Sequence, residues 1–216
     1  MDFSKIKAKL YSAVISDTLD SLELFDRVLS PGIRPIDDNS ILCGWARGGL
    51  YLPIYHDDET VNVYEHELKL IDSLKPDEIP VLICHGLKKI APWGELLSTR
   101  AKFLKAAGCL TDGSVRDVRL IREMGFSVFA GNISPLDSKY RGKLTWTDVP
   151  GEINGVQVNS GDLIFGDIDG VLIIPKPKVE TVIEKALEKV SEENIVRKKL
   201  EEGETLERIF SEHGIL

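Results

Sequence analysis

The sequence predicts a single α/β domain over residues 1–216, with a core at about 30–176 and helical arms at 1–25 and 177–216. Segments with the apolar spacing of helices alternate with short apolar runs that are typical of buried strands. No segment repeats at a fixed period, and no low-complexity linker divides the chain. With 216 residues, 43% of them hydrophobic, the chain can bury a substantial core.

The first half of the chain predicts five elements in order. Residues 3–24 have a helical pattern, in one or two pieces, and the Pro-, Gly- and Asp-rich stretch 30–40 predicts a loop. Residues 41–53, ILCGWARGGLYLP, predict one or two strands interrupted by glycines. A helix is expected over 61–74, followed by a buried strand over 79–84.

The middle of the chain begins with a helix over 93–108, for which Gly108 is the expected stop. A strand of about six residues should start at Cys109. A short helix to Met124 and a strand at 126–130 follow. These elements continue the alternation of strands and helices that is typical of an α/β domain.

The last part of the chain combines hairpins with helices. Residues 131–151 are expected to form a loop. Residues 153–175 contain three short β runs, and Asn-Gly, Ser-Gly and Asp-Gly turns between them favour hairpins. A long helix should begin near Pro177, and a short helix over 204–214 completes the C-terminal arm.

Composition excludes several classes of function. The formal net charge of −8 argues against a general nucleic-acid binder, which needs a basic face. No apolar run approaches the 18 or so residues of a membrane span, and the start MDFSKIKAKL is too polar for a signal peptide, so we expect a cytoplasmic protein. Cys43, Cys84 and Cys109 have apolar neighbours and wide spacing, which favours reduced core residues.

Charged residues gather where one predicted helix begins and one predicted strand ends. The helix from Gly94 and the strand from Cys109 run in opposite directions over similar lengths, so Glu95 should share a rim with Arg116 and Asp117. An isolated Arg-Asp pair is more often a surface ion pair. A helix N-terminus beside an arginine, however, is suited to binding a carboxylate.

Two carboxylates at that rim would repel a bound organic acid unless a cation lay between them. Oxygen ligands in small number suit Mg²⁺ or Mn²⁺ that keeps several waters. The alternative for Glu95 is an ordinary N-terminal helix carboxylate, favoured by the helix dipole.

A further carboxylate interrupts the apolar stripe of the C-terminal helix. Glu193 and Arg197 continue the centre line of this stripe at helical spacing. Either they form an i, i+4 ion pair after the stripe has ended, or this end of the helix offers Glu193 to a site on a neighbouring surface. The stripe consists of Val179, Val182, Ile183, Ala186 and Val190.

Three stretches resemble the RraA-like family, which includes 4-hydroxy-4-methyl-2-oxoglutarate aldolases and regulators of ribonuclease E. They are APWGELLSTRAKFLKAAGCLTDGSVRDVRLIREMGFSVFAGNISPLD, VNSGDLIFGDIDGVLIIP and EENIVRKKLEEGETLERIFSEHGIL. The most specific feature is an acidic residue, twenty intervening residues and then Arg-Asp, here Glu95 followed by Arg116 and Asp117. The resemblance implies a β/β/α swivelling-domain fold, a homotrimer or hexamer, and sites between subunits.

The resemblance also implies roles for individual residues. Asp117 would bind the divalent metal directly, and Glu95 would bind it through water. Arg116 would hold substrate oxygens, and the segment Gly94–Leu97 would bind the substrate, with the amides of Leu96 and Leu97 taking the carboxylate of a pyruvate unit. Glu193 would come from the adjacent chain.

These roles imply a metal-dependent (class II) aldolase that cleaves a 4-hydroxy-2-oxo acid, such as 4-hydroxy-4-methyl-2-oxoglutarate, and releases pyruvate. Decarboxylation of oxaloacetate would use the same enolate chemistry. A metal-bound water oriented by Glu95 or Glu193 is the expected proton donor. The alternative is a non-catalytic regulator that binds a ribonuclease or helicase, and the acidic residue Glu95 favours the enzyme.

This sequence departs from the family pattern in places, at Trp93 and in the segment that contains GWARGGLYLP, Tyr55 and His56. GWARGGLYLP stands where the family commonly has G-x-A-x-T, which leaves the identity of the 2-oxo acid open. His56, Asp57, Asp58 and His66 follow, and their spacing favours a solvated loop and helix start over a metal site.

Overall fold

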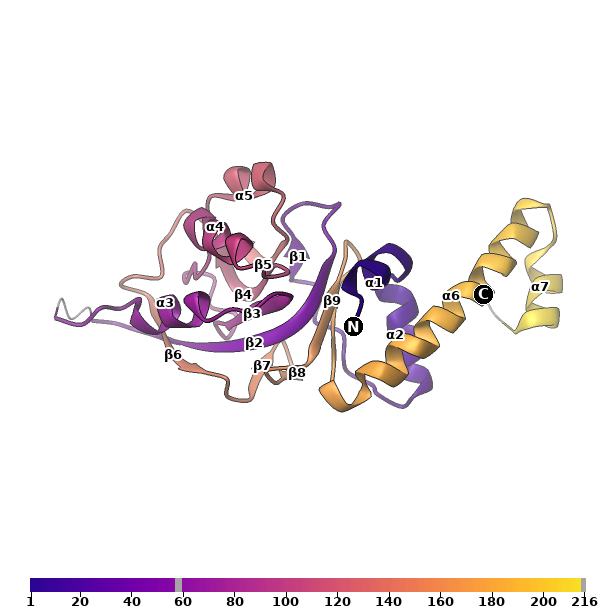
Figure 1. Ribbon diagram of the computed structural model, residues 1–216, viewed down its shortest axis with the longest axis horizontal. Coiled ribbons are helices and arrows are strands. Elements are labelled where there is room, and N and C mark those ends of the chain that lie inside the picture. Colours follow the sequence, from indigo (N-terminus) through magenta and orange to yellow (C-terminus); the bar gives the residue numbers. More distant parts are fainter. Residues whose placement is uncertain (57–59, 215–216) are drawn as a thin grey trace.

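A mixed sheet of eight strands forms the centre of the protein (Figure 1). The computed structural model describes residues 1–56 and 60–214. The sheet strands are β1 (Arg34–Pro35), β2 (Leu42–Pro53), β3 (Glu78–Ile83), β4 (Cys109–Val115), β5 (Val128–Ile133), β6 (Gly142–Thr147), β9 (Leu163–Gly166) and β10 (Val171–Ile174). Their order is β1-β5-β4-β3-β2-β9-β10, with β6 also paired to β2, and β7 (Gly151–Ile153) and β8 (Val156–Val158) form a separate hairpin.

Seven α-helices accompany the sheet in the described part of the chain. They are α1 (Phe3–Lys9), α2 (Ser12–Ser21), α3 (Glu65–Asp72), α4 (Glu95–Phe103), α5 (Val118–Met124), α6 (Val179–Glu201) and α7 (Leu206–His213), and the short 3-10 helix η1 (Lys176–Lys178) precedes α6. None of these helices is both long and apolar enough to cross a membrane.

The long strand β2 organises the sheet because its two halves have different neighbours. Residues 42–45 pair with β9 and residues 49–53 pair with β6, both antiparallel, while β3 runs parallel along the other side. The glycine-interrupted segment is therefore one strand. Strands β2 to β5 are parallel neighbours, which explains why β3 has a continuous apolar sequence instead of an alternating one.

The two edges of the sheet approach each other through the segment before β1. The amide of Leu29 donates to the carbonyl of Val171 (2.8 Å), and the amide of Ile173 donates to the carbonyl of Arg27 (2.9 Å). Arg34 in β1 donates to the carbonyl of Asp169 next to β10 (3.1 Å). The sheet is thereby nearly closed around an apolar interior that includes Val81, Leu110, Phe129, Ile164 and Ile173.

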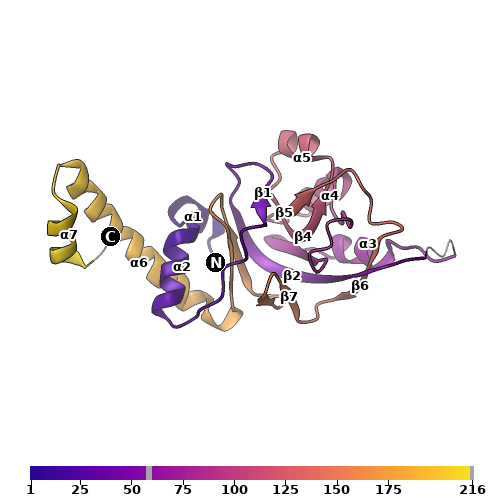
Figure 2. The ribbon, with the colours of Figure 1, turned by 180° about the vertical axis from the view of Figure 1, so that it is seen from behind.

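Helices cover the sheet at two separate places. Helices α3, α4 and α5 lie together and pack over a core that includes Tyr51, Leu70 and Trp93. Helices α1, α2 and α6 pack against the end of the sheet formed by β9 and β10, and the second half of α6 projects away with α7 (Figure 2). The expected stripe is confirmed, because its first four members are buried and Val190 packs against the same cluster.

The expected helix over 93–108 is too long at its C-terminal end. Helix α4 ends at Phe103, and Lys105 already has a left-handed backbone with φ of 63°. Gly108 has φ of 155°, and a Cβ there would lie 2.4 Å from Leu42 Cδ1 and 2.5 Å from the Ser127 carbonyl oxygen. Glycine is required there for close packing beside β4, and it does not stop the helix.

The expected loop over 131–151 is wrong in part. Strand β5 continues to Ile133, and β6 occupies 142–147 as an edge strand against β2. The sequence of β6, GKLTWT, has one fully buried apolar side chain, Leu144, so its apolar signal is weak. Its strand conformation is fixed by pairing with a segment about ninety residues earlier.

Candidate active site

The end of β4 and the start of α4 meet at one rim of the sheet, as expected. Val115 forms a bridge with Trp93, and the amide of Arg116 donates to the carbonyl of Trp93 (3.0 Å). The amide of Glu95 then donates to Asp117 Oδ2 (3.2 Å). The prediction that Glu95, Arg116 and Asp117 share one rim is confirmed.

A buried tryptophan fixes the first turn of α4. Trp93 Nε1 donates to Ser98 Oγ (2.8 Å), and Ser98 Oγ donates to the carbonyl of Gly94 (2.9 Å). A Cβ on Gly94 would lie 2.8 Å from Asp117 Oδ2 and 3.1 Å from Arg116 Cγ. Glycine therefore allows the Arg-Asp pair to approach the helix terminus.

Asp117 has an uncommon backbone conformation for its position. It is the N-cap of α5 in the left-handed region (φ 59°, ψ 29°), and its side chain does not cap that helix. Aspartate tolerates this region better than most residues. As a result the carboxylate turns toward the amide of Glu95 on α4, and the side chain stays 42% exposed.

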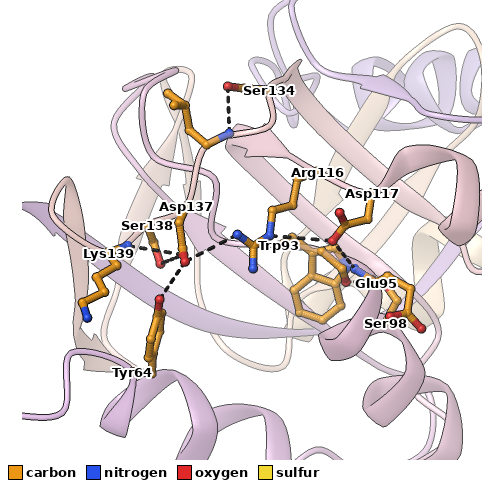
Figure 3. Close-up of polar contacts among 12 residues, drawn as sticks. Tyr64, Trp93, Glu95, Ser98, Arg116, Asp117, Ser134, Asp137, Ser138 and Lys139 are labelled. Atoms are coloured by element: carbon orange, nitrogen blue, oxygen red, sulfur yellow. Dashed lines mark hydrogen bonds and ion pairs between the residues drawn. The ribbon is translucent and has the colours of Figure 1, made fainter.

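Arg116 lies between two carboxylates (Figure 3). Its Nε is 3.7 Å from Asp117 Oδ2, and its Nη1 is 3.4 Å from Asp137 Oδ2. The hydroxyl of Tyr64 donates to the same Asp137 oxygen (2.8 Å). These ion pairs place the guanidinium beside Gly94 at the start of α4.

Asp137 is held in its charged form. Partial burial alone would raise its pKa, but hydrogen bonds from Tyr64 and the Lys139 amide, together with the charge of Arg116, outweigh burial and lower the pKa. For Tyr64, burial and the hydrogen bond to Asp137 raise the pKa far above its ordinary value. Tyr64 is therefore a hydrogen-bond donor at neutral pH.

A small cavity of about 180 Å³ opens at this rim. Its floor and walls come from the start of α3, the segment before α4, the turn after β4 and the loop after β5. The lining residues include Tyr64, Glu67, Pro92, Trp93, Gly94, Glu95, Leu96, Leu97, Arg116, Asp117 and Asp137. The cavity combines apolar walls with a few converging polar groups, as small-molecule sites do.

One wall of the cavity contains a buried carboxylate. Glu67 on α3 is only 6% exposed, and it accepts a hydrogen bond from the fully buried hydroxyl of Tyr51. Burial raises the pKa of Glu67 to about 7, against the opposing effects of Tyr51 and Arg116. A carboxyl group of this kind can gain or lose a proton near neutral pH.

Sequence reasoning missed Tyr64, Glu67 and Asp137. Glu67 had a detectable signal, because it lies three and four residues before Leu70 and Ile71 on the apolar face of α3. A carboxylate within such a stripe is the same kind of signal that drew attention to Glu193. Asp137 lies in an irregular loop, where spacing carries no such information.

The residues at the rim fit a hydrated divalent metal. Asp117 offers a half-exposed carboxylate, and Glu95 lies beside it with Oε1 accepting a hydrogen bond from Thr99 (2.7 Å). Within residues 1–56 and 60–214, no group of three or more His, Cys, Asp or Glu is placed to hold a metal ion. An ion held through Asp117 would keep mostly water ligands, which suits Mg²⁺ or Mn²⁺.

The two residues whose amides are expected to bind a carboxylate also line the cavity. Leu96 and Leu97 belong to the first turn of α4, and both residues line the cavity. Amides in the first turn of a helix have no partner within the helix. They are available to an anion beside Arg116.

Glu193 lies far from this rim within one chain. It accepts a hydrogen bond from the hydroxyl of Tyr11. The part of α6 that contains it lies at the opposite end of the molecule from α4 (Figures 1 and 2). The expectation that Glu193 reaches the site of an adjacent chain stays a prediction.

Of the four residues after β2 that were considered as a metal site, the structure describes His56 and His66. Asp57 and Asp58 lie outside the described residues. His66 is on α3, and its Nδ1 is 3.1 Å from the carbonyl of Thr145.

Comparisons with known proteins identify the family of this chain. Residues 12–173 match the model of the RraA-like family, described as Aldolase/RraA. A protein of Halalkalibacterium halodurans, named as a candidate 4-hydroxy-4-methyl-2-oxoglutarate aldolase, is 31% identical over 197 residues that cover 89% of this chain and 86% of that protein. Protein DlpA of Legionella pneumophila is also 31% identical over 197 residues, which cover 91% of this chain but 31% of DlpA.

The fold is that of solved RraA structures. RraAS2 of Streptomyces coelicolor, described as an unusual member of the RNase ES inhibitor RraA protein family, is 25% identical with a TM-score of 0.79. The superposition covers 88% of this chain and 93% of that chain. On the family match and the shared fold, this chain belongs to the RraA-like family.

Proposed function

We propose that the protein is a divalent-metal-dependent lyase that cleaves a 4-hydroxy-2-oxo acid and releases pyruvate. The observation that carries the proposal is the meeting of Asp117, Arg116 and the first turn of α4 at one cavity. The similarity to a candidate 4-hydroxy-4-methyl-2-oxoglutarate aldolase supports it. Oxaloacetate, which also yields a pyruvate enolate on loss of carbon dioxide, is a second substrate of the same class.

Different residues of the cavity bind different parts of the substrate. The first-turn amides of α4 bind the carboxylate of the 2-oxo acid, and Arg116 donates to its oxygens. Arg116 can do so because its guanidinium lies beside the start of α4, between Asp117 and Asp137. The negative charge that develops when the carbon–carbon bond breaks then lies beside a fixed cation.

Asp117 is the residue that would hold the metal, and Glu95 would contact it through water. When bound, a divalent ion would polarise the keto oxygen of the substrate and stabilise negative charge on it. Trp93 and Ser98 keep the first turn of α4 in place while negative charge develops on the substrate. Pro92 and Leu97 supply apolar walls that reduce the access of bulk water.

The test is pyruvate release from a panel of 2-oxo acids by the purified full chain, with Mg²⁺, with Mn²⁺ and after chelation. We expect release from at least one 4-hydroxy-2-oxo acid in the presence of metal and its loss after chelation. Circular dichroism should show that the chelated protein keeps its fold, because the metal contacts one protein carboxylate directly. Full activity without metal would contradict the proposed metal dependence.

A regulator that acts only by binding a ribonuclease or helicase is the second candidate. The likeness to RraAS2 favours it, since that protein is described within an RNase ES inhibitor family. The same panel separates the two functions. A regulator would release no pyruvate from any acid at any metal concentration.

A further inference from the structure

We propose that Glu67, positioned by Tyr51, is the residue that exchanges protons with the bound substrate. This inference rests on the lyase function proposed above and assigns its acid–base step. Glu67 lines the same cavity as Arg116 and the first turn of α4, so a substrate bound there would lie next to it.

The surroundings of Glu67 are those of a core position. It is 6% exposed, and Leu70 and Ile71 on the same face of α3 are buried in the core. Its hydrogen-bond donor, the hydroxyl of Tyr51, comes from β2 and is itself completely buried. An apolar residue would be more stable here, because a buried carboxylate loses its hydration. A cost of this kind at the wall of a cavity points to a function.

The charged groups around Glu67 are engaged with one another. Arg116 contacts Asp117 and Asp137, and Tyr64 also donates to Asp137. Arg116 lowers the pKa of Glu67 and Asp137 raises it, and these two effects are both smaller than that of burial. Cys84, directly after β3, also lies near, and burial raises its pKa so far that it stays a neutral thiol. Glu67 is therefore the group in this wall that changes charge near neutral pH.

The proposed step conserves atoms and electrons without a co-reactant. The Glu67 carboxylate accepts the proton of the C4 hydroxyl while the C3–C4 bond breaks. The electron pair of that bond moves to C3 and gives the enolate of pyruvate, whose negative charge lies beside Arg116. The protonated Glu67 then returns the proton to C3, which yields pyruvate, a second carbonyl compound and the original carboxylate.

The first variant is Glu67→Gln, assayed in the full-length protein with Mg²⁺ and the panel acid that the wild type cleaves fastest. Glutamine can still accept the hydrogen bond of Tyr51, but it cannot carry the proton. We expect kcat to fall by about a hundredfold or more, with KM and the thermal midpoint close to the wild type. Exchange of the pyruvate methyl protons with deuterium oxide, followed by NMR, should fall in parallel, since it reports proton transfer at C3 without bond cleavage.

The second variant, Tyr51→Phe, tests the positioning role through the pH profile. Tyr51 stabilises the ionised form of Glu67, so its loss should raise the pKa of Glu67. The acidic limb of the kcat profile should therefore move to higher pH. The matched control is Glu65→Gln, which changes an exposed glutamate on the same helix that pairs with Lys69 (2.6 Å). This control should keep the wild-type kcat and pH profile.

Each outcome decides between defined alternatives. If Glu67→Gln keeps kcat and methyl exchange within about threefold of the wild type, Glu67 does not transfer the proton, although the lyase function stands. If Glu67→Gln does not fold, an acidic limb that stays unmoved in Tyr51→Phe refutes the inference. A wild type that releases no pyruvate refutes both the lyase function and the inference.

Discussion

Arg116 and Asp117 are adjacent, yet their side chains have different surroundings. The guanidinium of Arg116 is held between two carboxylates, whereas Asp117 has a half-exposed carboxylate next to the amide of Glu95. In the proposed function, Arg116 binds the substrate and Asp117 binds the metal. Substitutions that preserve size can distinguish these two tasks.

We expect Arg116→Lys to lower turnover by about a hundredfold, because lysine keeps the charge but loses the planar fork. Its affinity for Mn²⁺, measured by calorimetry, should match the wild type. Asp117→Asn should lower both Mn²⁺ affinity and turnover, and added metal should restore part of the activity. Arg119→Lys, at an exposed position that pairs with Glu123 (2.7 Å), is the control and should leave both quantities unchanged. Near wild-type turnover in either test variant would contradict its assignment.

The glycine before α4 gives a second prediction. A methyl group at Gly94 would lie 2.8 Å from Asp117 Oδ2, so Gly94→Ala should displace the Arg-Asp pair from the helix terminus. Turnover should fall by about tenfold or more, since small displacements in an active site are costly. Gly32→Ala is the matched control, because a methyl group there meets nothing within 4 Å. Equal turnover in the two variants would show that the close approach at Gly94 has no role in catalysis.

Individual elements depend on contacts that sequence proximity does not reveal. The first residue of α2, Ser12, has no capping side chain before it, because Tyr11 makes no such bond. Instead Asp167, in the turn between β9 and β10, accepts from the Ser12 amide (2.7 Å) and from its hydroxyl (2.6 Å). The N-terminal arm is thus tied to the sheet.

Asp167→Ala should therefore destabilise the protein by about 1 to 2 kcal/mol, the usual cost of a lost N-terminal cap. Urea unfolding followed by circular dichroism measures this change. Asp169→Ala in the same turn keeps the carbonyl that accepts from Arg34, and it should cost less than about 0.5 kcal/mol. Equal stability of the two variants would contradict the capping role.

Much of the fold followed from patterns within single elements. The stripe of α6 and the apolar run of β3 were recognised because each signal is local and strong. Strand β6 was missed because its pairing with β2 is a long-range contact. The predicted helix over 93–108 extends beyond the end of α4, because the sequence does not show that Gly108 is needed for packing beside Leu42.

The same difference between local patterns and long-range contacts explains which residues of the site could be predicted. Glu95, Arg116 and Asp117 were placed together by counting residues along one helix and one strand, and by resemblance to a family. Asp137 was missed because only the path of the loop after β5 brings it to Arg116. Which loops meet at one rim of the sheet depends on the whole fold.

At the scale of the whole molecule, the position of Glu193 predicts an assembly. Glu193 is far from Arg116 within one chain, and it lies on α6, whose second half projects from the sheet with α7 (Figure 1). If Glu193 completes the site of an adjacent chain, the protein should be a trimer or hexamer at micromolar concentration by light scattering. A solution that contains only monomer would contradict this.

A mixing experiment then tests whether the site is shared between chains. Glu193→Gln and Asp117→Asn should each have low activity alone, because every site in either assembly lacks one group. When the two variants are unfolded and refolded together, about one site in four should join an intact Asp117 with an intact Glu193 from its neighbour. Pyruvate release should rise above that of either variant to roughly a quarter of the wild-type rate.

The control mixes Asp117→Asn with Arg116→Lys. These two residues are adjacent in one chain, so each chain of the mixture lacks one member of the pair. No mixed assembly can contain an intact pair, and activity should not recover. Recovery only in the first mixture would assign Glu193 to the neighbouring site, and no recovery in either would place its role within its own chain.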